Sequence, residues 1–229
     1  MIKACIFDMF ETLVTLFTGR IYFSDDFARD MDIPYDVYRP LWHETDNDRT
    51  AGKLTIGEAA ESVLKKLGRY SPEAVEHLLN KRHESISDTF EATPEETYLL
   101  LKELKDRGIK TGLISNCYSD ERDMIRVSSL MPYLDSVKLS YEQGIKKPDP
   151  KMFLDIANDL GVSPEECLYV GDGGSNELQA ATASGMTAVQ ANWFRHLAYE
   201  PHIPSPLFED FPHAATRPDI IKFIEAQNS

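Results

Sequence analysis

The fold is indicated first by the segment Ile2-Lys3-Ala4-Cys5-Ile6-Phe7, which Asp8 follows at once. A short and largely apolar run of this kind predicts a strand that is buried on both faces of a sheet. From Thr93 onward, similar runs alternate with helical patterns. Strands are predicted at 109–115, 137–140, 167–170 and 186–190, and helices at 93–108, 120–130, 149–161 and 175–185. This alternation predicts an α/β fold with a doubly wound parallel sheet and helices on both of its faces.

The segment between the first strand and Thr93 has a different pattern. Residues 17–90 show helical periodicity and no convincing strand, as in Gly57–Leu67, which Gly68 ends. We therefore expect an inserted helical cap at 17–90 and a core formed by 1–16 and 91–229. Within the core, Thr93-Pro94-Glu95-Glu96 and Ser163-Pro164-Glu165-Glu166 have the spacing of capping boxes. The tail from 194 to 215 is expected to be an ordered loop before a last helix at 218–226.

The composition limits the partners and the compartment. The 229 residues carry 38 Asp and Glu against 24 Lys and Arg, a net charge of −14. Nucleic acid is not expected as a partner, because phosphate backbones are bound by clustered Lys and Arg. An anionic substrate would need a locally positive site. No apolar stretch approaches the length of a membrane span, and the three cysteines have no paired spacing, so we expect a cytoplasmic protein with buried free thiols.

Polar residues gather where the predicted strands end. They are Asp8, Ser115 with Asn116, Lys147, and Asp172. Each alone is compatible with an ordinary turn, a helix cap or a solvated charge. The carboxyl ends of parallel strands meet at one edge of a sheet, and this edge is where such folds bind their ligands. The joint pattern therefore predicts a single site.

Four segments resemble, in order, the four motifs of the haloacid dehalogenase superfamily. The segments are Phe7-Asp8-Met9-Phe10-Glu11-Thr12-Leu13, Leu113-Ile114-Ser115-Asn116, Gly144-Ile145-Lys146-Lys147-Pro148-Asp149-Pro150, and Tyr169-Val170-Gly171-Asp172 with Glu177. The pattern D-x-x-x-T alone would be weak evidence for the superfamily. Four motifs that occur in order and cover the chain are strong evidence for it. The resemblance implies a Rossmann-like core with a small helical cap after the first motif.

The resemblance also implies a mechanism and a ligand set. Asp8 would be the nucleophile and form a covalent intermediate. Mg²⁺ would be held by Asp8, the backbone carbonyl of Phe10 and Asp172, with Glu177 as a ligand or as the partner of a bound water. The groups that would contact substrate or the nucleophile are Lys147 as a cation, Ser115 and the amide of Asn116 on phosphoryl oxygens, and Thr12 near Asp8. The expected substrate is a small phosphorylated metabolite.

Phe10 departs from the pattern of the phosphatases in this superfamily. They normally carry an aspartate two residues after the nucleophile, as general acid and base, and phenylalanine cannot transfer a proton. An aromatic residue here resembles the metal-independent 2-haloacid dehalogenases, in which Arg39 of the cap could bind a carboxylate or the halide. Those enzymes typically lack an aspartate at the position of Asp172, and this chain retains both Asp172 and Glu177.

Three functions therefore stay open at this point. Phosphoryl transfer is favoured by the carboxylate pair, and dehalogenation is favoured by Phe10. A protein that binds a phosphorylated ligand without catalysis is the third possibility. A dinucleotide-binding Rossmann protein is not expected, because no G-x-G-x-x-G follows the first strand.

Overall fold

The computed structural model describes residues 1–229 and contains one six-stranded sheet in the order β3-β2-β1-β4-β5-β6, with every neighbouring pair parallel. The strands are β1 (Ala4–Phe7), β2 (Lys110–Ser115), β3 (Ser136–Leu139), β4 (Cys167–Gly171), β5 (Thr187–Ala191) and β6 (His213–Ala214). This order confirms the doubly wound parallel sheet. The chain builds β2 and β3 on one side of β1 and then β4 to β6 on the other. Ligand sites of such sheets lie where the direction of winding reverses.

The register of the central strands brings their polar ends together. Phe7 pairs with Leu113 of β2 and with Val170 of β4. Asp8 therefore follows β1 at the same level as the ends of both neighbouring strands, and its backbone N–H donates to the carbonyl of Val170 at 2.9 Å. The predicted common edge is thus formed by hydrogen-bonded neighbours.

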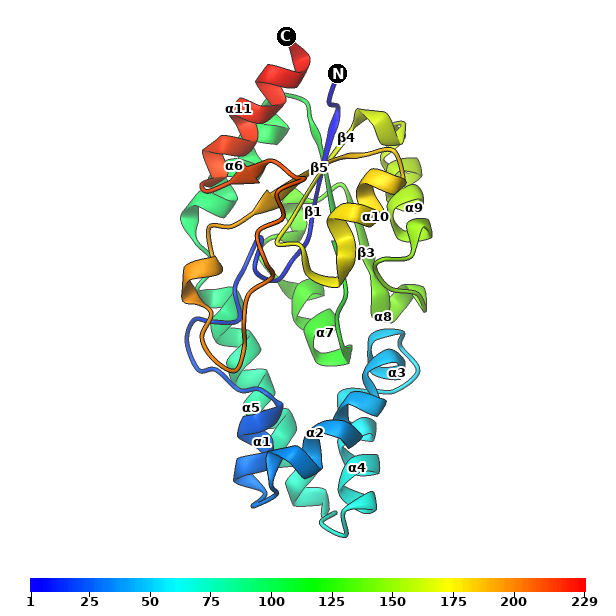
Figure 1. Ribbon diagram of the computed structural model, residues 1–229, viewed down its shortest axis with the longest axis vertical. Coiled ribbons are helices and arrows are strands. Elements are labelled where there is room, and N and C mark those ends of the chain that lie inside the picture. Colours follow the sequence, from blue (N-terminus) through cyan, green and yellow to red (C-terminus); the bar gives the residue numbers. More distant parts are fainter.

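Helices cover both faces of the sheet (Figure 1). One face packs on α6 (Glu95–Asp106), α7 (Ser119–Val127) and α11 (Arg217–Asn228) through a cluster of 27 buried residues. The other face packs on α9 (Pro150–Leu160) and α10 (Glu177–Ala183) through a cluster of 14. A short helix, α8 (Ser140–Gln143), follows β3. Burial of this apolar surface is the main stabilising contribution to such a core.

The inserted segment forms a helical body at one end of the molecule, drawn in blue and cyan in Figure 1. Its helices are α1 (Ser24–Asp30), α2 (Tyr35–Glu44), α3 (Asp46–Thr50), α4 (Ile56–Lys66) and α5 (Pro72–Glu91). It has a separate cluster of 13 buried residues, which includes Phe27, Tyr38 and Leu64. In α5, Ala74 and Leu78 belong to this cluster, whereas Ile86 and Phe90 belong to the sheet's. The boundaries 17 and 90 stay a prediction, and α5 is shared by the two bodies.

Several local predictions can be compared with the structure. Ser163 and Glu166 form the expected capping box, on a short 3₁₀ turn. The capping box at Thr93 was wrong, because the Thr93 hydroxyl donates to the carbonyl of Phe90 and Pro94 occupies the N-cap. The tail contains the short strand β6, which was not predicted. All three cysteines are buried and free, as expected. None of the helices combines the length and the hydrophobicity that a membrane span requires.

Candidate active site

Lys147 lies at the centre of the polar edge of the sheet. Its side chain is 3% exposed, and its ammonium group contacts Asp8 and lies 2.5 Å from Glu177 Oε2. It also lies 3.2 Å from the hydroxyl of Tyr169, which itself donates to Glu177 Oε2 at 2.8 Å. These contacts join residues from the end of β1, the middle of β4, the start of α10 and the loop before α9.

The electrostatics of this group are dominated by burial and by an excess of carboxylates. Asp8 and Glu177 contact one buried cation, Lys147, and Asp172 lies close to both carboxylates. Burial has the largest effect on Asp8 and raises its pKa. The charge of Lys147 lowers the pKa, and repulsion from Glu177 raises it. The net result is a pKa of about 8 for Asp8. Burial alone would lower the pKa of Lys147, but the carboxylates of Asp8 and Glu177 raise it above its ordinary value. These carboxylates therefore favour the charged form of Lys147, which is the one cation in contact with Asp8 and Glu177.

The three carboxylates meet the requirements of a hard divalent cation. Ligand oxygens of Asp8, Asp172 and Glu177 all lie within 4.8 Å of one another. Burial, then the charge of Glu177, raises the pKa of Asp172, as expected for carboxylates that share too little positive charge. Mg²⁺ prefers oxygen ligands of this kind and keeps several waters beside one or two carboxylates. The donor set thus fits the group that the sequence implied.

The loop after β4 holds the two late carboxylates in place. The N–H of Gly174 donates to Asp172 Oδ1 at 2.9 Å, and the N–H of Gly173 donates to Glu177 Oε1 at 3.1 Å. A Cβ at position 171 would lie 2.1 Å from Glu177 Oε1, so Gly171 is required for this close approach. Ser205 completes the arrangement by donating to Asp172 Oδ2 at 2.9 Å.

Asn116 performs a function that the sequence did not indicate. Its side-chain oxygen accepts from the N–H of Lys147 at 2.8 Å, and its amide nitrogen donates to the carbonyl of Lys147 at 3.1 Å. This pair of bonds fixes the backbone that carries the buried ammonium. The amide nitrogen also lies 3.3 Å from the hydroxyl of Ser175. Ser115 is fully buried, and its hydroxyl makes only a 3.4 Å contact with the carbonyl of Asn116.

Thr12 and Arg39 are not brought to this group. Thr12 is buried, but its hydroxyl has no hydrogen-bond partner, so the expected bond near Asp8 is not formed. Its carbonyl instead accepts from the indole of Trp193 at 2.8 Å, which ties the loop after β1 to the tail. Arg39 is exposed on α2 and does not line the cavity described next. The proposed anion-binding role of Arg39 therefore has no support in the geometry.

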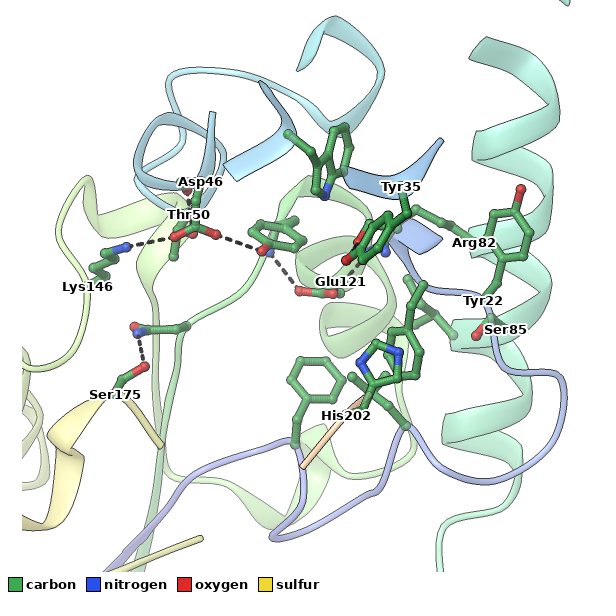
Figure 2. A pocket seen from close by; sticks show the side chains of 18 residues that line it. Tyr22, Tyr35, Asp46, Thr50, Arg82, Ser85, Glu121, Lys146, Ser175 and His202 are labelled. Carbon is green, nitrogen blue, oxygen red and sulfur yellow. Dashed lines mark hydrogen bonds and ion pairs between the residues drawn. The ribbon is translucent and has the colours of Figure 1, made fainter. Parts of the chain in front are cut away.

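A cavity of about 460 Å³ lies between the cap and this edge of the sheet (Figure 2). Phe10, Asn116 and Ser175 form its floor on the core side, and Tyr22, Tyr35 and Trp42 are contributed by the cap. Phe10 is partly buried and packs edge-on against Phe90, with 6.4 Å between ring centroids. A cavity of this size accommodates a small-molecule ligand.

Tyr169 and Ser205 are site residues that sequence reasoning missed. Tyr169 lies inside a buried strand two residues before Gly171, and a buried tyrosine hydroxyl normally has a hydrogen-bond partner. The buried position of Tyr169 in the predicted strand therefore indicated that its hydroxyl has a polar partner. Ser205 lies in the irregular tail, 33 residues from Asp172, and no local pattern indicates their contact.

A family model, described as haloacid dehalogenase-like hydrolase, matches residues 2–185. The chain belongs to this family. It is accordingly a hydrolase by family, and the resemblance seen in the four motifs is confirmed.

Curated relatives are matched over segments of the sequence. A glyceraldehyde 3-phosphate phosphatase of Methanopyrus kandleri is 32% identical over 103 residues, which are 44% of this chain and 44% of that protein. A phosphoserine phosphatase of Thermus thermophilus is 34% identical over 95 residues, 41% of this chain and 38% of that protein. The matched segments thus span less than half the length of these relatives.

Solved structures of the superfamily share the fold. A 2-haloacid dehalogenase from Pseudomonas syringae superposes with a TM-score of 0.69 at 20% identity, covering 99% of this chain and 100% of that one. An enzyme of the superfamily from Bacteroides thetaiotaomicron, crystallised with magnesium and inorganic phosphate, gives 0.62 at 18% identity, covering 83% of this chain and 94% of that one. At these identities the likeness concerns the fold alone.

Proposed function

We propose that the protein is a Mg²⁺-dependent phosphatase that acts on a small phosphorylated molecule through an aspartyl-phosphate at Asp8. The observation that carries this proposal is the cluster of three carboxylates, Asp8, Asp172 and Glu177, two of which share the buried ammonium group of Lys147. An uncompensated excess of buried negative charge is costly, and a bound divalent cation would relieve it. The phosphatase names of the curated relatives support the same activity.

The ligands would be Asp8, Asp172, the backbone carbonyl of Phe10, and Glu177 directly or through water. When bound, Mg²⁺ would neutralise phosphoryl oxygens and keep Asp8 ionised. The contact between Glu177 and Lys147 means that Glu177 serves the lysine as well as the metal site.

The chain's own residues supply the covalent step. A carboxylate oxygen of Asp8 forms a bond to phosphorus while the bond between phosphorus and the ester oxygen breaks, and that oxygen leaves with the electron pair. Lys147 stabilises the negative charge on the phosphoryl group. Asn116 fixes the backbone position of Lys147, and the carboxylates of Asp8 and Glu177 favour its charged form. Water then hydrolyses the aspartyl-phosphate, which returns Asp8 and releases inorganic phosphate.

Dehalogenation is the second candidate, favoured by Phe10 and by the dehalogenase among the structural neighbours. Two observations weigh against it. Asp172 does not contact Lys147 and has no role in a reaction without metal, and the carboxylate cluster would repel a haloacid carboxylate. Arg39, the expected cation for that carboxylate, lies outside the cavity.

The two candidates are separated by one panel of assays. Release of phosphate from acetyl phosphate and phenyl phosphate, and of halide from 2-chloropropionate, is measured with Mg²⁺ and with EDTA. We expect phosphate release that requires Mg²⁺ and disappears in Asp8→Asn, which preserves the shape of the side chain and removes its charge. Halide release at full rate in EDTA would replace this proposal with the dehalogenase.

A further inference from the structure

Tyr169 places a phenolic hydroxyl inside the buried polar group at the edge of the sheet. The residue lies in the middle of β4 and is fully buried. Its ring packs edge-on against Phe153 of α9, with 5.3 Å between ring centroids, and a Cβ at position 171 would lie 3.1 Å from its Cε1. The close packing of the ring therefore fixes the position of the hydroxyl.

The hydroxyl completes the set of acceptors around the ammonium group of Lys147. A lysine ammonium has three N–H donors and no acceptor. Lys147 Nζ donates to Asp8 Oδ1, to Glu177 Oε2 at 2.5 Å and to the hydroxyl oxygen of Tyr169 at 3.2 Å. Three donors thus meet three acceptors, so the orientation of the ammonium group is set by all three side chains together.

The direction of the Tyr169 hydroxyl bond follows from the chemistry of its partners. Because an ammonium group cannot accept a hydrogen bond, the phenol accepts from Lys147, and its own hydrogen points to Glu177 Oε2 at 2.8 Å. Glu177 is held in turn by the N–H of Gly173, which donates to Oε1 at 3.1 Å. Tyr169, Lys147 and Glu177 therefore form a closed triangle of hydrogen bonds beside the nucleophile.

We propose that Tyr169 is a positioning residue for the nucleophile. Its hydroxyl accepts one N–H of Lys147, so that the other two are directed at Glu177 and Asp8. Without the hydroxyl, one buried N–H would have no acceptor, which is costly, and the ammonium group would reorient toward its two remaining carboxylates. The oxygen of Asp8 that attacks phosphorus would then be displaced, and a displaced nucleophile reacts more slowly. This loss of rate rests on the proposed phosphatase function, whereas the ordering of the ammonium group does not.

The first measurement follows the ammonium group itself by NMR spectroscopy, with isotope-labelled lysine side chains and the protein in EDTA without substrate. The signal of Lys147 is assigned by its absence in Lys147→Arg. Its protons should exchange slowly with water, because the group is buried and fully hydrogen-bonded. In Tyr169→Phe, which keeps the ring, exchange should be about tenfold faster. Tyr38→Phe is the matched control, since it removes the hydroxyl of another fully buried tyrosine, in the cap, and should leave the exchange unchanged.

The second measurement is the rate at which acetyl phosphate forms the aspartyl-phosphate, followed by rapid quench in the presence of Mg²⁺. In Tyr169→Phe, the rate at saturation should fall about tenfold, because the nucleophile is less well aligned. The half-saturating concentration should change less than about twofold, because the charge of Lys147 is retained. Tyr38→Phe should change neither value. Thermal unfolding of each variant verifies that it is folded.

The outcomes separate this inference from the function on which it rests. If the wild-type protein forms no aspartyl-phosphate, the phosphatase proposal fails, and the proton exchange alone decides whether Tyr169 orders Lys147. Equal exchange rates in the wild type and in Tyr169→Phe would overturn the positioning role. A rate loss that is matched by a rise in the half-saturating concentration, or that Tyr38→Phe reproduces, would also overturn it, since either result indicates a general effect on the fold.

Discussion

Lys147 and Glu177 form an ion pair in which the side chains are 3% and 1% exposed, 30 residues apart in the sequence. The lysine also contacts Asp8, so the cation is shared between the nucleophile and a metal-site carboxylate. A buried pair of this kind is rarely a net source of stability, although removing one partner is strongly destabilising. We infer that the pair positions the positive charge of Lys147 for the reaction.

Replacing Lys147 with methionine should therefore destabilise the protein. The variant keeps the aliphatic bulk and leaves the carboxylates of Asp8 and Glu177 without their cation, which should lower the free energy of unfolding by about 3–5 kcal/mol. Urea denaturation in EDTA measures the change. Lys146→Met is the control, since Lys146 is partly exposed and its ion pair with Asp46 should contribute only about 0–1 kcal/mol. Equal losses in the two variants would show that the buried charge is not decisive.

Mg²⁺ should stabilise the protein more at high pH than at low pH. Burial and the neighbouring carboxylates raise the pKa of Asp8 to about 8 and also raise that of Asp172. An acid whose folded pKa is raised stabilises the fold below its unfolded pKa, and this contribution is lost as the pH rises through about 8. Mg²⁺ offsets the loss by binding the ionised carboxylates. The increase in Tm on adding Mg²⁺ should therefore grow between about pH 6 and pH 8.

The specificity of this effect is checked by two variants. Asp172→Asn removes one proposed ligand and should abolish most of the Mg²⁺-induced change in Tm. Asp210→Asn removes an exposed carboxylate of the tail and should leave it unchanged. A Mg²⁺ effect of the same size in both variants, or one that decreases with pH, would contradict the metal site.

Phe10→Asp should change how the rate depends on the leaving group. Phe10 cannot donate a proton from the position two residues after the nucleophile, so we expect kcat/KM to fall steeply as the leaving group becomes more basic. The aspartate should reduce this slope by restoring an acid worth ~10²–10⁴-fold for poor leaving groups. The measurement is kcat/KM over a series of aryl and alkyl phosphates. A flat series in the wild type would show that another residue donates the proton.

The packing of Phe10 makes stability a necessary control for that experiment. Its ring contacts Phe90, so aspartate would leave a cavity and place a carboxylate in a partly apolar setting. Phe10→Leu removes the ring without adding an acid. It should retain the steep dependence on the leaving group.

The sheet and the main residues at its edge could be predicted from the sequence because both depend on local patterns. Apolar runs located the ends of β1, β2 and β4 to within two residues, and the geometry of parallel strands predicted that Asp8, Lys147 and Asp172 lie at one edge. Those predictions needed only periodicity and the known geometry of strand ends.

The features of the site that could not be predicted from the sequence depend on contacts between distant segments. Arg39 and Trp42 lie on the same cap helix, and nothing in its pattern shows that Trp42 lines the cavity while Arg39 faces solvent. Thr12 was predicted to bond near Asp8, but the loop after β1 turns its hydroxyl to a position without a partner. The contact of Ser205 with Asp172 requires the path of the tail. Such features follow from tertiary packing rather than from local propensity.

The central claim is that Asp8 carries the phosphoryl group during turnover, and mass spectrometry of the peptide containing Asp8 tests it most directly. The protein is incubated with Mg²⁺ and phenyl phosphate, and in parallel with 2-chloropropionate in EDTA, and each reaction is quenched in acid. We predict that Asp8 gains the mass of one phosphoryl group in the first reaction, that Asp8→Asn gains none, and that the second reaction leaves Asp8 unmodified. A propionate ester on Asp8, or turnover of phenyl phosphate by Asp8→Asn, would contradict the account.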